Sequence, residues 1–98
     1  MLTKTYSGAG RTCRVTFEHP NPGGAAAATL CGDFNNWDPS AYPMERRADG
    51  SFVLTIPLQV GRSYRFKYLI DAHRWENDWN ADSYETNEYG SDDSVVVV

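Results

Sequence analysis

The stretch Leu30-Cys31-Gly32-Asp33-Phe34-Asn35-Asn36-Trp37-Asp38 joins a short apolar run to an abrupt turn. The run breaks at Gly32, and the pair Asn35-Asn36, two residues that tolerate a positive φ, predicts that the chain reverses there. Strand alternation turns Gly32 and Phe34 to one face. We therefore expect Phe34 to close one end of a hydrophobic core, and Trp37 to be carried beyond the turn onto the rim of that core.

Trp37 has two interpretations. An exposed indole beside Asn and Asp side chains suits a planar polar ligand such as a sugar. The C–H edges of a pyranose ring meet the electron-rich face of the indole, and the neighbouring polar groups take the hydroxyls. The alternative is that Trp37 is a half-buried cap on the core. The stretch alone leaves both interpretations open.

The rest of the chain indicates a single all-β domain. Its 98 residues suit one domain with a modest core, 13% of them are aromatic, and no segment keeps a helical period. About seven short antiparallel strands separated by frequent turns predict an immunoglobulin-like β-sandwich. We expect strands near residues 13–18, 30–34, 52–56, 64–69, 74–76 and 94–98. Residues 1–11 are expected to form a flexible lead-in or a short edge strand, and residues 77–91 a long loop.

Charge and cysteine content exclude several kinds of function. A formal net charge of −4 argues against binding to nucleic acid or to an anionic membrane surface, because both need a basic face. The N-terminus has no apolar signal segment, so a cytoplasmic location is expected. Cys13 shares the inward face of Val15, whereas Cys31 is out of phase with Leu30, so the two thiols are expected to stay unpaired.

The sequence offers no convincing catalytic or cofactor site. The pairs Asp33 with Asp38 and Glu76 with Asp78 could be imagined as the two acids of a glycosidase, but such acids need a cleft that shifts one pKa. These four residues lie in turn sequences, where Asp commonly caps the backbone. The histidines and cysteines lack zinc-site spacing, so neither a metal nor another cofactor is expected.

The opening stretch also resembles a known family. Gly32-Asp33-Phe34-Asn35-Asn36-Trp37 is similar to the strand-turn signature of the family 48 carbohydrate-binding modules. These are the isoamylase-type early-set domains of glycogen branching and debranching enzymes and of the beta subunit of AMP-activated protein kinase. Five motifs in the family's order cover the chain from about Arg14. The other four are Gly50-Ser51-Phe52, Tyr64-Arg65-Phe66-Lys67-Tyr68, Asp71 with Arg74-Trp75-Glu76-Asn77-Asp78, and Tyr89-Gly90 before Ser94-Val95-Val96-Val97-Val98.

The resemblance implies an early-set sandwich and a surface cradle for α-1,4-linked glucan. In the family the cradle consists of two Trp residues and a Lys, which match Trp37, Trp75 and Lys67. The residues themselves agree, because two indoles on one rim can follow a curved glucan, and Lys67 alternates away from the aromatic face of its strand. Asn77 is expected to be a further polar partner.

Two more positions near the closing strand depart from the family pattern. Tyr89 replaces an apolar residue and still offers a stacking face, while Asp93 replaces an Asn. A carboxylate accepts hydrogen bonds but cannot donate them. Asp93→Asn is therefore expected to strengthen binding, by about 1 kcal/mol. Trp79 is either a third platform or a filler of the core.

The sequence therefore predicts non-catalytic binding of α-glucan, such as glycogen or malto-oligosaccharides. Aromatic stacking by Trp37 and Trp75 is the expected mechanism. A second hypothesis is a protein-interaction module that docks on a separately encoded glycogen-metabolising enzyme or kinase and binds sugar weakly or not at all.

Overall fold

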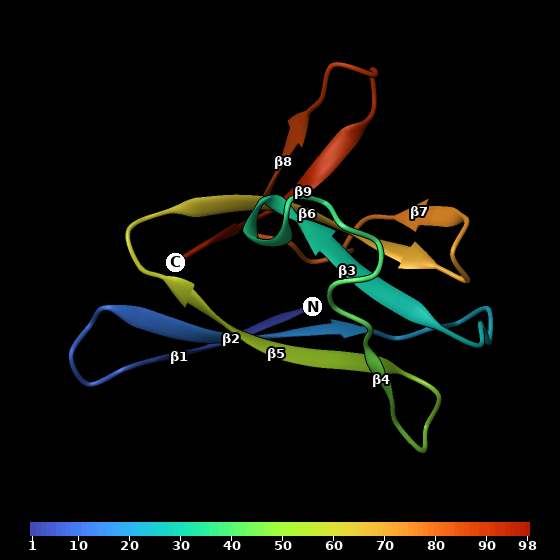
Figure 1. The fold of residues 1–98 in the computed structure, drawn as a ribbon, viewed down its shortest axis with the longest axis horizontal. Helices are drawn as coiled ribbons and strands as arrows, with labels where there is room; N and C mark the ends of the chain where they lie inside the picture. Colours follow the sequence, from blue (N-terminus) through green and yellow to red (C-terminus); the bar gives the residue numbers. More distant parts are fainter.

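The computed structural model describes residues 1–98 as two antiparallel sheets packed into a sandwich (Figure 1). One sheet has the strand order β1-β2-β5-β4, and the other has the order β3-β6-β9-β8, with β7 pairing with β6. The elements are β1 Leu2–Tyr6, β2 Thr12–His19, β3 Ala28–Gly32, the 3-10 turn η1 Asp33–Asn35, β4 Glu45–Arg46, β5 Phe52–Gln59, β6 Ser63–Ile70, β7 Arg74–Glu76, β8 Ser83–Thr86 and β9 Asp92–Val97. The predicted all-β immunoglobulin-like class is confirmed.

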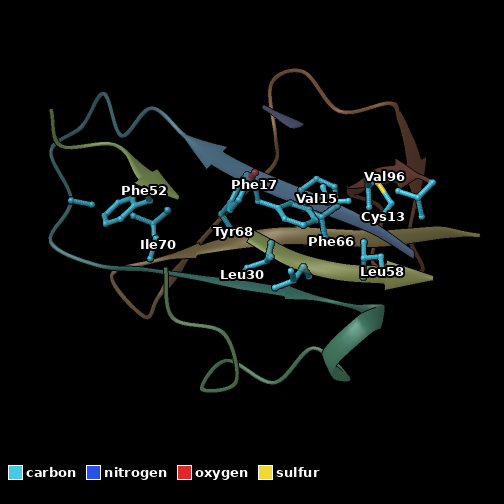
Figure 2. Close-up of a cluster of buried hydrophobic side chains, with 14 residues drawn as sticks. Cys13, Val15, Phe17, Leu30, Phe52, Leu58, Phe66, Tyr68, Ile70 and Val96 are labelled. Carbon is cyan, nitrogen blue, oxygen red and sulfur yellow. The ribbon is translucent and has the colours of Figure 1, made fainter. Parts of the chain in front are cut away.

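The core lies between the two sheets and is made mainly by alternate residues of β2, β3, β5 and β6, with Val96 of β9 (Figure 2). Phe17 of β2 meets Phe66 of β6 with ring centroids 5.0 Å apart and planes at 77°, the edge-to-face arrangement that aromatic quadrupoles prefer. Phe34 is partly buried against this cluster, and its ring centroid lies 5.7 Å from that of Phe17. Phe34 thus closes one end of the core, as the opening stretch predicts.

A buried carboxylate lies at the margin of this core. The Tyr68 hydroxyl donates a hydrogen bond to Asp78 Oδ2 at 2.6 Å, and the Met1 ammonium contacts the same oxygen. Burial raises the pKa of Tyr68, and the charge of Asp78 raises it further, so the hydroxyl remains a donor. The Asp78 amide in turn donates to Ser94 Oγ at 2.8 Å. These bonds fix the chain just after β7.

Two expectations about secondary structure need comment. Residues 77–91 contain the strand β8, so the prediction of an uninterrupted loop there was wrong. All four residues of β8 are exposed, and an edge strand without a buried face lacks the alternation that sequence reading needs. Of the two alternatives for residues 1–11, the structure has the edge strand, since β1 pairs with β2. No helix in the structure has the length and apolar character to cross a bilayer.

Both cysteines are buried and free, as predicted. Cys13 belongs to the core between the sheets. Cys31 is on the opposite face of its sheet, where its thiol donates to the Asp38 carbonyl oxygen at 3.6 Å. Burial raises the pKa of Cys31, and the charge of Asp38 adds to this effect, so the thiol stays protonated.

Gly32 gives a test of the packing at the end of β3. A Cβ at this position would lie 2.5 Å from the Arg65 carbonyl oxygen and 2.8 Å from the Phe34 ring. Gly32→Ala should therefore lower the free energy of unfolding by about 1–3 kcal/mol, the usual cost of overpacking. Urea denaturation measures the change. Gly23→Ala is the control, since nothing lies within 4 Å of its Cβ position, and equal losses in both variants would contradict the packing argument.

Candidate functional site

A groove of about 950 Å³ lies on the outer face of the β3-β6-β9-β8 sheet. Alternation in β6 turns Phe66 and Tyr68 into the core and leaves Arg65 and Lys67 on this outer face. The register pairs Leu69 with Trp75, so β7 adds its indole to the same face. The residues that line the groove are Asp33, Trp37, Arg65, Lys67, Trp75, Asn87, Glu88, Tyr89, Ser91 and Asp93.

Two indoles form the apolar part of the groove. The ring centroids of Trp37 and Trp75 lie 6.4 Å apart, with the ring planes at 64°. Trp75 is 49% exposed and Trp37 is half-buried. The ring of Trp37 is therefore half-buried, as the cap interpretation expects, and it also lines the groove on the rim of the sandwich. The two rings offer faces that are angled to each other rather than coplanar.

The turn that carries Trp37 is tightly constrained. The backbone is left-handed at Asn36 (φ 56°) and at Trp37 (φ 57°), so the reversal falls one residue later than Asn35-Asn36 predicts. A bulky residue in this region is strained, at a cost of about 1–2 kcal/mol. The side chain of Asn35 offsets the strain. Its Nδ2 donates to the Leu30 carbonyl oxygen at 3.0 Å, and its Oδ1 accepts from the backbone amide of Gly32 at 3.1 Å.

The floor of the groove is an ionic cluster. Lys67 Nζ lies 3.6 Å from Asp93 Oδ1 and donates to Ser91 Oγ at 3.3 Å. Arg65 pairs with Glu85 at 2.7 Å and approaches Asp93 at 3.8 Å. The side chains of Lys67 and Asp93 are only 14% and 9% exposed. Cations and carboxylates therefore neutralise one another beneath the indoles.

The loop between β8 and β9 forms one wall of the groove and presents Tyr89, which is 86% exposed. Asn87 organises this loop. Its Oδ1 accepts from the Tyr89 amide at 2.9 Å and the Ser91 amide at 3.2 Å, and its Nδ2 donates to Ser91 Oγ and to Asp93 Oδ1 at 3.0 Å. Sequence reasoning missed Asn87, although an Asn three residues before Gly90 is a usable turn signal.

Two residues considered from the sequence lie elsewhere. The Asn77 amide is held by Ser94, whose hydroxyl donates to Oδ1 at 2.8 Å, and by the Asp92 carbonyl, which accepts from Nδ2 at 2.9 Å. Asn77 lines a separate pocket of about 270 Å³, together with Trp79. Trp79 is 69% exposed, so it does not fill the core, and it is absent from the groove lining.

Glu76, the last residue of β7, fixes the position of the strand that carries Trp75. The Glu76 carboxylate accepts from Arg74 Nε at 2.6 Å and pairs with His19 Nε2 at 2.9 Å. His19 Nδ1 accepts from the Asn21 amide, which leaves the ring proton on Nε2. Desolvation by itself would raise the pKa of Glu76, but the hydrogen bonds from His19 and Arg74 outweigh it and lower the pKa. Glu76 thus stays ionised and holds β7 in place.

Comparison with known proteins identifies the family of this chain. Residues 10–85 match the family described as Carbohydrate-binding module 48 (Isoamylase N-terminal domain). The chain is 37% identical over 75 residues to the 1,4-alpha-glucan branching enzyme GlgB of Pseudoalteromonas atlantica and equally to that of Photobacterium profundum, in each case over 74% of this chain and 10% of the relative. It is 42% identical over 50 residues to the corresponding enzyme of Novosphingobium aromaticivorans, over 50% of this chain and 7% of that protein.

The chain therefore spans about a tenth of the length of these relatives. The match to the family covers most of the chain and includes both indoles and the floor of the groove up to Glu85. On this evidence the chain belongs to the family 48 carbohydrate-binding modules, the isoamylase N-terminal domains.

Proposed function

We propose that this module binds α-1,4-linked glucan, such as glycogen or malto-oligosaccharides, without acting on it chemically. The observation that carries the proposal is the pair of indoles, Trp37 and Trp75, 6.4 Å apart in one groove above a polar floor. Each indole supplies a stacking face for one sugar ring. The angle of 64° between them suits a chain that curves from one ring to the next.

The polar groups of the groove complement sugar hydroxyls. Lys67 can donate to a hydroxyl oxygen, and Glu88 can accept from a hydroxyl hydrogen. Tyr89 adds an exposed aromatic face from the loop between β8 and β9. Asp93 already contacts Lys67 and Asn87. We therefore propose that it holds the floor of the groove together and does not itself bind the sugar.

The name of the relatives supports the proposed ligand class. Their name describes them as 1,4-alpha-glucan branching enzymes, and this chain corresponds to a small part of them. We propose that this module shares the glucan ligand of these enzymes but not their branching activity. A cytoplasmic location is part of the proposal, since the free thiols Cys13 and Cys31 suit a reducing compartment.

A docking role on a separate glycogen-metabolising enzyme or kinase is the second candidate function. The observation that favours it is Trp79, which is 69% exposed and lies outside the groove. Large exposed aromatic side chains are typical of protein interfaces. If wild-type protein shows no glucan binding, this candidate becomes the preferred function.

Replacement of either groove indole tests the glucan proposal. Trp37→Ala and Trp75→Ala should each weaken glycogen binding by on the order of 1 kcal/mol or more, because each removes one stacking face. Affinity electrophoresis in gels with and without glycogen measures the retardation. Thermal unfolding of the same variants shows whether the fold is kept.

Trp79→Ala is the matched control for these variants, because it removes an equally large exposed indole from outside the groove. We expect it to migrate like the wild type in glycogen gels. Equal loss of retardation in all three variants would contradict the assignment of the site to this groove. Cooperative unfolding of the Trp37 and Trp75 variants at much lower temperature would make these rings part of the core instead.

Asp93→Asn tests the floor of the groove. The substitution removes a negative charge 3.6 Å from Lys67 Nζ and 3.8 Å from Arg65, so the two cations lose their common partner. We now expect weaker binding of a linear malto-oligosaccharide, by roughly 1 kcal/mol. This reverses the expectation from the sequence, which assumed a carboxylate free to meet a sugar hydroxyl.

Titration calorimetry at one ionic strength measures the effect. Asp92→Asn is the control, since its carboxylate contacts Thr86 and does not line the groove. Tighter binding by the Asp93→Asn variant would favour direct contact between residue 93 and the sugar, as the sequence suggested.

A further inference from the structure

We propose that Asp33 is the positioning residue of the groove: its carboxylate holds the indole of Trp37 at the angle that the pair of rings requires. This inference rests on the proposed glucan binding and adds a residue that does not itself need to touch sugar. Asp33 lies in the 3-10 turn η1 and lines the groove beside the two indoles.

The carboxylate of Asp33 joins two parts of the molecule. Its Oδ1 accepts a hydrogen bond from Trp37 Nε1 at 3.0 Å, and its Oδ2 accepts from the backbone amide of Arg65 at 2.8 Å. Arg65 belongs to β6, the strand to which β3, β7 and β9 all pair. The indole of Trp37 is thus tied, through one side chain, to the most constrained strand of its sheet.

This arrangement differs from an ordinary turn cap. In the usual Asx cap, an Asp carboxylate accepts from the backbone amide two residues later, as Asp38 does with the Ser40 amide at 2.9 Å. Asp33 instead accepts from a side chain and from an amide 32 residues along the chain. Both of its oxygens are therefore used to fix the ring relative to the sheet.

The backbone hydrogen bonds of the turn do not themselves fix the ring of Trp37. The backbone bonds from the Trp37 amide to the Gly32 carbonyl at 2.9 Å and from the Asp38 amide to the Asn35 carbonyl at 3.2 Å hold the main chain of the turn. They leave the side-chain torsions of Trp37 free. Its half-exposed ring could rotate towards solvent, and the pairing with Trp75 at 6.4 Å would then be lost.

Asp33→Asn tests the anchor with little change in shape. In Asn an NH2 group, which cannot accept a hydrogen bond, replaces one of the two carboxylate oxygens, so either Trp37 Nε1 or the Arg65 amide loses the acceptor that it has in the wild type. We expect a three- to tenfold loss of affinity for a linear malto-oligosaccharide, about the worth of one hydrogen bond. Asp38→Asn is the matched control, because it removes the same charge from the same turn and leaves the hydrogen bond of the Trp37 indole in place, and its affinity should equal that of the wild type.

A spectroscopic measurement separates positioning from a general structural role. In proton–nitrogen NMR, the indole N–H of Trp37 should exchange more rapidly with solvent in Asp33→Asn than in the wild type. The indole N–H of Trp75 serves as the internal reference, since it has no hydrogen bond to Asp33. Asp33→Ala, which keeps neither acceptor, should show at least the same acceleration, and unchanged exchange at Trp37 in both variants would overturn the proposal.

A double-mutant cycle identifies the residue through which Asp33 acts. Trp37→Phe keeps an aromatic face and removes the N–H donor, so adding Asp33→Asn should cause no further loss of affinity in that background. Additive losses would overturn the proposal, because Asp33 would then act independently of Trp37. If the wild type binds no malto-oligosaccharide, the glucan function fails, and the indole exchange alone still decides whether Asp33 holds the ring.

Discussion

Strand β6 pairs with three other strands, and its two-residue alternation fixes both faces of its sheet. Phe66 and Tyr68 point inward and meet the other sheet, and so Arg65 and Lys67 must point outward. A shift of one residue in register would exchange these two sets. The groove therefore depends on the same constraint as the core, since burying two aromatic rings determines where the two cations stand.

Much of this arrangement could be read from the sequence because it follows from local pattern. Alternation in residues 64–69 predicted the two faces of β6, and the Asn-rich turn predicted that Trp37 lies beyond the end of β3. The contacts that hold the groove could not be read in this way. Asn87 reaches Asp93, and Asp33 reaches the Arg65 amide, through a register that only the assembled sheet defines.

Two residues whose hydrogen-bond partners could not be foreseen show the same limit. Asn77 was expected to meet sugar, but its amide is held by Ser94 and Asp92, which come near only because β9 passes beside the loop after β7. Asp93 was expected to be open to a ligand, yet its side chain is only 9% exposed and its carboxylate lies 3.6 Å from Lys67 Nζ. A polar side chain forms hydrogen bonds with whichever groups the fold brings near, and its residue type alone does not predict which groups these are.

The two buried thiols lie in different parts of the sandwich: Cys13 is between the two sheets, and Cys31 is on the outer side of its sheet, against the turn at Asp38. Local opening of a protein differs in free energy from one region to another. The rates at which a thiol-specific reagent modifies the two cysteines therefore measure two separate opening events in one molecule. Modification of Cys31 reports the lifting of the turn that bears Trp37, whereas modification of Cys13 reports the separation of the two sheets.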